Sequence, residues 1–478
     1  MYSCYAHIQP NLLKSHGRDF CRFLFIGLND NTPKERIRAG IADLFFANHK
    51  PFQVINSLEK QLEESERRIQ NKQHTAHTTS IVMTLHLSAL GLNKIQQQHW
   101  CSPSEHTFFN KGMKDQFVSK ALSDPHPTEW ESPYRQPIDL LIEIASDTLS
   151  SLDDFEQKLT FFLLQKGIGH IQFVEQGKKL YWGKDAIEPF GFKDNITTPT
   201  FFKKKIGHTP IYQKNEATKL NIILDKRGGS FLVFRKLEQD VLAFNEKVHY
   251  LSRRLAIPIS LAEAQIMGRF KDGTPLDLSD KPGVLETEVS RKTFDEDYKT
   301  GYSGDLKGLR CPLHAHVRRA NPRSDRSCII KHLKYDPNRE LDRDVIGVIV
   351  RRGIPYENPG VSQGLLFLCY QASIDTQFVA IQQEWSNNGH QPDCESDSEF
   401  SKMSIGLDPI AGQYRNVPSY RKNIWNKSWG VKNERAKNRV ELEVDFTDLV
   451  YLKGGAFLYT PSIPDLMSLY PKKPNATV

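Results

Sequence analysis

The first half of the chain alternates short apolar runs with longer amphipathic segments. Runs rich in apolar and β-branched residues at 22–28, 80–87 and 138–146 predict buried strands. The segments between and after them carry charged residues at i, i+3 and i+4 spacing, which predicts helices. The predicted helices cover residues 34–46, 51–73, 109–121 and 152–165. Strand, helix, strand, followed by strand, helix, strand, is the order of a ferredoxin-like α+β unit.

The second half begins after a stretch without clear periodicity, residues 201–220, which we interpret as a connection. Beyond it, residues 229–245 predict a strand that runs into a helix. An apolar strand is predicted at 344–356, ending in two arginines and a glycine, and a core strand at 364–370. Residues 453–466 predict a closing strand and helix.

Composition indicates a globular protein with more than one domain. The chain has 478 residues, 25% of them charged and 38% hydrophobic. The net charge of +7 is small for this length and the basic residues are scattered, which argues against nucleic-acid binding. No apolar run reaches the about 18 residues that a transmembrane helix needs.

The ends and the cysteines favour a reducing compartment. The opening residues, MYSCYAHIQPNLLK, lack the apolar core and cleavage site of a signal peptide. The seven cysteines are odd in number and form no C-x-x-C pair, so we read them as free thiols. We therefore expect a cytoplasmic protein.

The stretch richest in candidate chemistry reads RCPLHAHVRRANPR and covers residues 310–323. In an extended conformation His314, His316 and Arg318 would share one face of a strand. A neutral imidazole can ligate haem iron, and guanidinium groups can hold the two haem propionates. The pattern alone also fits a surface or capping histidine, so it leaves the function open.

This stretch, with VIVRRGIPYE and GLLFLCYQASIDTQFVAIQQEW downstream, closely resembles the dye-decolourising (DyP-type) haem peroxidases in their long bacterial form. The resemblance runs from about residue 8 to about residue 468. It implies an α+β fold of two ferredoxin-like halves, 1–215 and 216–478, whose antiparallel sheets pack against each other. It also implies one haem b per chain, bound in the second half.

The segment EPFGFKDNITTPT, residues 188–200, resembles the G-x-x-D-G fingerprint of that family. The resemblance places Asp194 above the haem on the peroxide side, where a carboxylate can move a proton between the two peroxide oxygens. The last glycine of the fingerprint is Asn195 here, and asparagine tolerates the left-handed backbone best after glycine. The similar loop GRFKDGTPL is set aside, because Asp272 fits a turn residue in an Asp-Gly pair.

In the second half the resemblance assigns His316 as the axial ligand of the haem iron and Arg351 as the distal arginine. A fixed cation there stabilises negative charge on the departing oxygen. The neighbouring Arg352 should point the other way on a strand. Arg323 is the expected contact of a haem propionate, and Arg318 is expected to be a further cofactor-binding residue.

Three further groups complete the expected site. Leu365 and Phe367 would wall the distal pocket, although a simple core role fits them equally well. Asp408 would accept the second ring N–H of the ligand histidine. Bulky donors cannot reach a buried haem edge, so a surface Tyr or Trp would relay electrons. The open candidates are Trp130, Trp182, Trp385 and Trp425.

The activity implied by the resemblance is one-electron oxidation of dyes and phenols by hydrogen peroxide through a ferryl and a porphyrin radical. The expected partners are peroxide and small aromatic donors, without nucleic acid or membrane, and self-association is left open. The alternatives are a haem-binding or haem-storage protein and a protein that releases haem iron, each with little peroxidase turnover.

Overall fold

The structure is a computed structural model. It describes residues 3–46, 54–70, 80–101, 106–194, 196, 199, 201–204, 212–214, 220–283, 305, 308–320, 347–389, 405–413, 422–426 and 441–471. Within these ranges no helix combines the length and the apolar character that crossing a membrane requires. The expected boundary between the halves, at residue 215, lies outside the described residues, as do Asn195 and Arg323.

The first unit has the strand order of a ferredoxin-like fold. Its sheet runs β3-β4-β1-β5 with antiparallel neighbours. The elements are β1 (Phe20–Leu28), α1 (Lys34–Phe46), β3 (Ile81–Leu87), β4 (Leu140–Ser146), α7 (Leu149–Lys166) and β5 (Gly169–Lys178). Every residue of β3 and β4 is buried, which explains why most of their side chains are apolar, although β3 also carries His86 and β4 carries Glu143.

Additional elements surround this unit. The helix expected over 51–73 is shorter, because residues 54 and 55 form a strand, β2 (Val54–Ile55), parallel to β3, before α2 (Leu58–Gln70) begins. The helix expected over 109–121 is two helices, α4 (Thr107–Lys111) and α5 (Gln116–Ala121). Gly112 ends the first of them with a φ of 77°, a left-handed conformation that breaks the helix.

The second unit repeats the same order. Its sheet runs β11-β13-β10-β16, and β12 also pairs with β13. The elements are β10 (Ser230–Gln239), α8 (Val241–Leu255), α9 (Ile259–Met267), β11 (Val350–Arg351), β12 (Ile354–Asn358), β13 (Ser362–Gln371) and β16 (Val450–Thr460), followed by α13 (Ile463–Met467). The strand predicted at 344–356 is thus two short strands, interrupted before Ile354.

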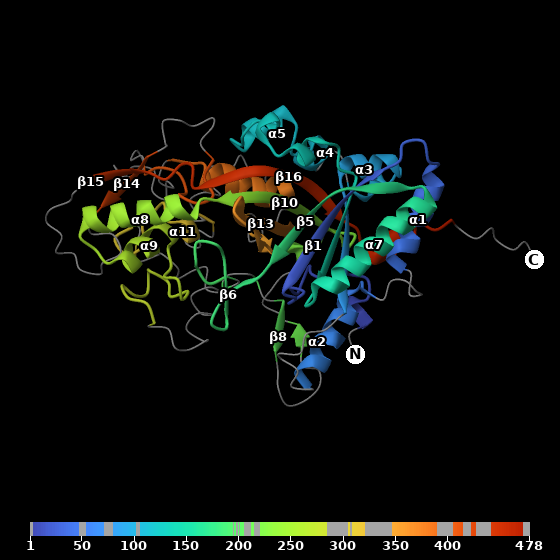
Figure 1. Ribbon diagram of the computed structural model, residues 1–478, viewed down its shortest axis with the longest axis horizontal. Helices are drawn as coiled ribbons and strands as arrows, with labels where there is room; N and C mark the ends of the chain where they lie inside the picture. Colours follow the sequence, from blue (N-terminus) through green and yellow to red (C-terminus); the bar gives the residue numbers. More distant parts are fainter. Residues whose placement is uncertain are drawn as a thin grey trace, which may run out of the picture.

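The two sheets pack face to face and also meet at an edge. The ring of Phe234 on β10 lies 5.2 Å from the rings of both Phe23 and Phe25 on β1. One residue pair, Tyr459 and Leu87, joins β16 to β3, so the strands form one continuous ten-stranded sheet. The prediction of duplicated ferredoxin-like halves is confirmed. In Figure 1, α8 and α9 lie toward one end of the molecule and α1 and α7 toward the other, with the strands β1, β5, β10 and β13 between them.

The extended conformation considered for the histidine pair does not occur, because α11 (His316–Ala320) is a helix. Just before this helix begins, the N–H of Ala315 donates a hydrogen bond to the carbonyl of Pro312. The helical turn separates the two histidines. His314 is fully buried with its ring 4.1 Å from that of Trp425, whereas His316 faces a cavity.

Candidate active site

A cavity of about 280 Å³ lies between the strands of the second unit and its helices. Its polar groups come from both halves of the chain and include Asp194, His316 and Arg351. Most of its walls are apolar, and the side chains that form them include Met267, Phe270, Leu365, Phe367, Phe378 and Ile410. An apolar hollow with a few convergent polar groups is the usual form of a cofactor or ligand site.

His316 enters this cavity with one ring nitrogen already engaged. Its Nδ1 lies 2.9 Å from Oδ2 and 3.1 Å from Oδ1 of Asp408. Asp408 is itself held in place, since its Oδ1 accepts the N–H groups of Ile410 at 2.8 Å and Ala411 at 2.9 Å. The carboxylate fixes the orientation of the ring and leaves Nε2 as the nitrogen available to a metal.

His316 and Asp408 each shift the pKa of the other toward its charged form. Burial disfavours a charge on His316, but the charge and hydrogen bond of Asp408 outweigh it and raise the pKa of the imidazole. Burial also disfavours a charge on Asp408, and here the charge and hydrogen bond of His316 lower the pKa of the carboxyl group. The sequence placed Asp408 as this partner, and the structure brings the two side chains together.

Asp194 and Arg351 form an ion pair at the cavity wall. The Asp194 side chain is only 6% exposed, whereas that of Arg351 is 30% exposed. Arg351 belongs to β11, while Asp194 comes from the loop that follows β7 (Asp185–Ile187) in the first half. The pair therefore depends on contact between the two halves.

The loop that carries Asp194 is fixed on two sides. The N–H of Asp194 donates to the carbonyl of Ala186 at 2.8 Å, and the N–H of Lys193 donates to the carbonyl of Lys271 at 2.9 Å. Gly191 has a φ of 92°, a left-handed conformation in which a side chain would be strained. The loop at 268–276, which the sequence analysis set aside, thus serves to hold the fingerprint loop.

The setting of that second loop supports the earlier interpretation of Asp272. Its carboxylate accepts the N–H of Thr274 at 2.9 Å and the N–H of Gly283 at 2.6 Å. The first contact is local to the turn, and the second ties the turn to a residue eleven positions along the chain. Asp272 is also absent from the cavity lining, although its neighbours Phe270 and Gly273 line it.

The two adjacent arginines face opposite ways, as the alternation of a strand predicts. Arg351 lines the cavity, and Arg352 donates from Nε to the carbonyl of Asn11 at 2.8 Å and from Nη2 to that of Leu12 at 2.9 Å. Burial lowers the pKa of the Arg351 guanidinium, and the negative charge of Glu188 acts against this.

Glu188 is a cavity residue that sequence reasoning missed. Its carboxylate accepts the N–H groups of Phe190 at 3.1 Å and Phe192 at 3.0 Å and the Nε2 of Gln239 at 2.9 Å. Burial raises the pKa of this carboxyl group against the effect of those donors. The only signal in the sequence was its place at the start of the fingerprint segment.

Of the remaining residues predicted to contact the cofactor, some line the cavity and others do not. Leu365 and Phe367 line the cavity. Arg318 is absent from the lining, because its guanidinium donates to the carboxylate of Asp305 at 3.2 Å and to the carbonyl of Cys311 at 2.8 Å. The geometry therefore gives no support to Arg318 as a cofactor contact. By contrast, Arg235 lines the cavity, and its buried Nη1 has no hydrogen-bond partner among the described residues.

A second, smaller cavity of about 30 Å³ lies on the other side of Asp194. It is lined by Ser15, His16, Lys179 and Arg352 together with Asp194. A space of this size with polar walls accommodates about two water molecules. Asp194 thus stands between the large cavity and a polar space that reaches His16.

His16 makes the stability of the protein depend on acidity. Burial, helped by nearby cations, lowers its pKa to about 4, from the 6.5 of a free imidazole. Between pH 6.5 and 4 the unfolded chain takes up a proton that the folded chain refuses, so the free energy of unfolding should fall by about 3 kcal/mol as the pH decreases. Denaturant titrations across this range measure the loss.

In His16→Asn this part of the pH dependence should disappear, because an amide does not titrate in this range. The fold should be kept, since the amide oxygen can accept the N–H of Arg18, which lies 3.0 Å from Nδ1 of His16 in the unchanged protein. The exposed His170→Asn is the control and should keep the slope of the unchanged protein. Equal slopes for His16→Asn and the unchanged protein would contradict the assignment.

Known proteins resemble this chain over nearly its whole length. The family model described as "Dyp-type peroxidase, C-terminal" matches residues 207–406. The multifunctional dye peroxidase of Amycolatopsis sp. is 27% identical, with 97% of this chain and 95% of that protein covered. The dye-decolorizing peroxidase msp1 of Mycetinis scorodonius is also 27% identical, over 74% of this chain and 70% of its own length.

Among solved structures, the DyP-type peroxidase of Anabaena sp. superposes with a TM-score of 0.77 at 28% identity, covering 98% of this chain and 95% of its own. The fold, the cavity and these similarities agree on one assignment. An apolar cavity with a carboxylate-backed imidazole also has the donor and the walls that haem requires. Over nearly its whole length the chain is thus similar to the DyP-type peroxidases.

Proposed function

We propose that this protein binds one haem b per chain and uses hydrogen peroxide to oxidise phenolic and dye donors in one-electron steps. One observation carries the proposal: a single cavity is lined both by His316, whose ring is bonded to Asp408 behind it, and by the Asp194–Arg351 pair. A haem-storage or iron-releasing protein would need only the first pair. The peroxidase relatives, which match over most of the chain, support the same choice.

His316 would hold the haem iron through Nε2, with Asp408 fixing the ring from the other side. Apolar side chains such as Leu365 and Phe367 would enclose the porphyrin. When bound, haem supplies the iron centre at which peroxide is cleaved and from which electrons are drawn. Arg235, with its unsatisfied Nη1, is a candidate contact for an anionic edge of the cofactor, and Arg323 stays a prediction from the sequence.

Asp194 would move the proton that cleavage of the O–O bond requires. Its carboxylate takes the proton from the inner peroxide oxygen and returns it to the outer one, which then leaves as water. Arg351, paired with Asp194 at the cavity wall, donates its N–H groups to the negative charge that develops on the leaving oxygen. The small polar cavity behind Asp194 gives this carboxylate a route for exchanging protons with water.

Rapid mixing of the haem-loaded protein with one equivalent of peroxide tests this proposal. The Soret absorbance should fall quickly, and the oxidised protein should then turn over an added dye. A Soret band that stays unchanged over seconds would contradict the peroxidase and favour the haem carrier. A protein that develops no Soret band when haem is supplied would contradict the assignment of His316.

The four tryptophans that could relay electrons from bulky donors differ in exposure. Of the four candidate tryptophans, Trp130 and Trp385 are 1% exposed and Trp425 is fully buried, whereas Trp182 is 64% exposed. Trp182 lies on β6 (Leu180–Trp182), which pairs with β7 next to the Asp194 loop. We propose Trp182 as the surface residue that passes electrons from large donors to the cavity.

Trp182→Phe should lower kcat/KM for a bulky dye by about tenfold, or about 1.4 kcal/mol of transition-state stabilisation. A small phenol that enters the cavity should keep its value. Steady-state rates with both donors measure the difference. Phe161→Ala is the matched control, because Phe161 is an equally exposed aromatic residue, at 65%, on α7. An unchanged dye kcat/KM in Trp182→Phe would contradict the relay.

We also propose a cytoplasmic location. The five cysteines that the structure describes, Cys4, Cys21, Cys101, Cys311 and Cys369, are free thiols. Proteins of oxidising compartments more often use such residues in disulfides.

A further inference from the structure

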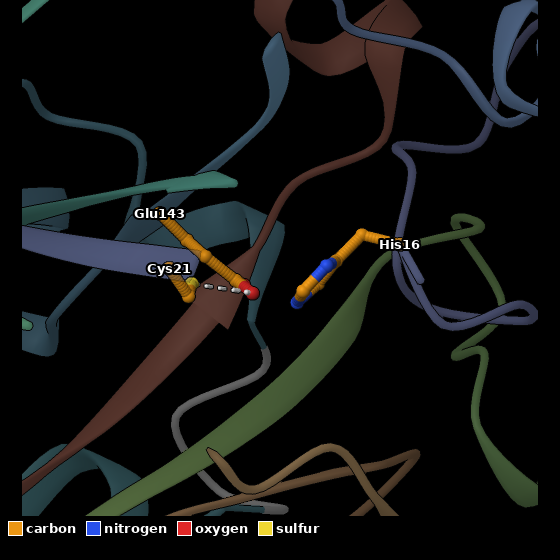
Figure 2. A group of neighbouring side chains, drawn as sticks. All are labelled: His16, Cys21 and Glu143. Carbon is orange, nitrogen blue, oxygen red and sulfur yellow. Dashed lines mark hydrogen bonds between the residues drawn. The ribbon is translucent and has the colours of Figure 1, made fainter. Parts of the chain in front are cut away.

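A polar cluster lies inside the otherwise apolar contact between the two sheets. At its centre is Glu143 on β4, 3% exposed. Its carboxylate accepts Nδ2 of Asn11 at 2.7 Å, the thiol of Cys21 at 3.7 Å and the hydroxyl of Tyr370 at 3.1 Å. Figure 2 shows the side chains of Cys21 and His16 directed at the same carboxylate.

Tyr370 links this cluster to the back of the haem cavity. Leu365 and Phe367 on β13 line the cavity, and the alternation of the strand puts Tyr370 on the opposite face. The residue paired with Tyr370 across the ladder is Val350, whose neighbour is the cavity residue Arg351. The phenol is fully buried, and only the thickness of one sheet separates it from the cavity.

The hydrogen bond to Glu143 gives this phenol a base. Burial, with the charge of Glu143, raises the pKa of Tyr370 well above its ordinary value, so the ring keeps its proton at rest. Burial also disfavours a charge on Glu143, but contacts with His86, His16 and Tyr370 outweigh it and lower the pKa of the carboxyl group. A protonated phenol beside an ionised carboxylate can lose an electron and a proton together.

We propose that Tyr370 is a redox-active residue that gives one electron to the peroxide-oxidised enzyme while its phenolic proton moves to Glu143. The step rests on the proposed peroxidase function, which supplies the oxidant. It breaks the O–H bond of Tyr370, forms one on Glu143, and leaves a neutral phenoxyl radical beside a neutral carboxylic acid. An electron from a donor and the proton from Glu143 restore the tyrosine. The pair thus stores one oxidising equivalent outside the cavity until a donor arrives.

The histidines of the cluster suit this role. His86 is fully buried, and its Nε2 lies 3.6 Å from Oε2 of Glu143. That nitrogen has no hydrogen-bond partner among the described residues, so it can accept a share of the proton after Glu143 is neutralised. His16 points at the same carboxylate and borders the small cavity next to Asp194.

A metal ion is the less favourable occupant of this cluster. His16, Cys21 and Glu143 offer nitrogen, sulfur and oxygen atoms within 4.8 Å of one another. However, the positive charges of Lys179, Arg18 and Arg352 all act on His16. A cation placed there would meet their repulsion, whereas proton transfer between neutral and anionic groups does not.

Rapid-freeze electron paramagnetic resonance after addition of one equivalent of peroxide, without donor, tests the inference. The haem-loaded protein should show a tyrosyl radical whose hyperfine width narrows when its tyrosines are ring-deuterated. Tyr370→Phe should lose this signal while its Soret band still responds to peroxide. Glu143→Gln should sharply reduce the signal, since an amide cannot take the proton.

Tyr459→Phe is the matched control. Tyr459 also donates to a carboxylate, that of Asp225 at 2.8 Å, but it lies at the opposite end of β16 from the cavity residue Val450. Its replacement should leave the signal unchanged. A tyrosyl signal that persists in Tyr370→Phe, or that disappears in Tyr459→Phe instead, would overturn the inference while the Soret response upholds the peroxidase. A protein whose Soret band ignores peroxide would overturn both.

Discussion

Asp194→Asn is expected to slow the reaction of the haem-loaded protein with hydrogen peroxide by about 10²- to 10⁴-fold, the usual contribution of a positioned proton-transfer group. Asparagine keeps the size of the side chain and can still accept a hydrogen bond from Arg351. It cannot take the proton from the inner peroxide oxygen. The observed rate of the Soret change, plotted against peroxide concentration, measures the effect directly.

Asp272→Asn provides the comparison for this experiment. Asp272 lies in the neighbouring loop of similar sequence, yet its carboxylate serves a turn through Thr274 and Gly283. Its replacement should leave the peroxide rate unchanged. If Asp194→Asn reacted as fast as the unchanged protein, proton transfer would have to be assigned to another group, with Glu188 as a further carboxylate in the cavity lining.

His316→Ala should abolish the Soret band of a haem held by histidine, with the loss of peroxide turnover, because no other described side chain offers an imidazole to the cavity. Added imidazole should restore part of the spectrum, since the substitution vacates space beside Asp408. Asp408→Asn should retain the haem but lower its affinity about 10- to 100-fold. Haem titrations followed by absorbance measure all three effects.

The exposed His249→Gln on α8 should titrate like the unchanged protein. A full Soret band in His316→Ala without added imidazole would show that the iron ligand lies elsewhere. A haem affinity in Asp408→Asn equal to that of the unchanged protein would contradict only the orienting role of that carboxylate.

The strands were predictable because their signals are local. The buried runs at β1, β3 and β4 are mostly apolar, as burial on both sides favours, and the charged Arg22 and Glu143 are exceptions. The opposite directions of Arg351 and Arg352 also follow from strand geometry alone. Resemblance, and not periodicity, suggested Asp194, His316 and Asp408 as one site.

The errors arose where distant residues decide the local structure. The spacing of the histidines around His316 would suit an extended strand, but a helix forms there and places His316 against Asp408, 92 positions away. Arg318 was expected at the cofactor because the sequence shows its charge but does not show that Asp305 accepts its hydrogen bond in the folded chain. Glu188 escaped notice because a single glutamate in a loop carries no signal until the fold buries it.

The position of β16 has a consequence for how the enzyme is made. This strand, Val450–Thr460, follows the other strands of the two large sheets in the chain, yet it lies between β10 and β3 and joins the two units. A ribosome must therefore synthesise residues 450–460 before the second sheet can be completed. Until then β10 and β3 lack the strand that joins them, so a chain that stops before β16 has two separate, incompletely paired sheets.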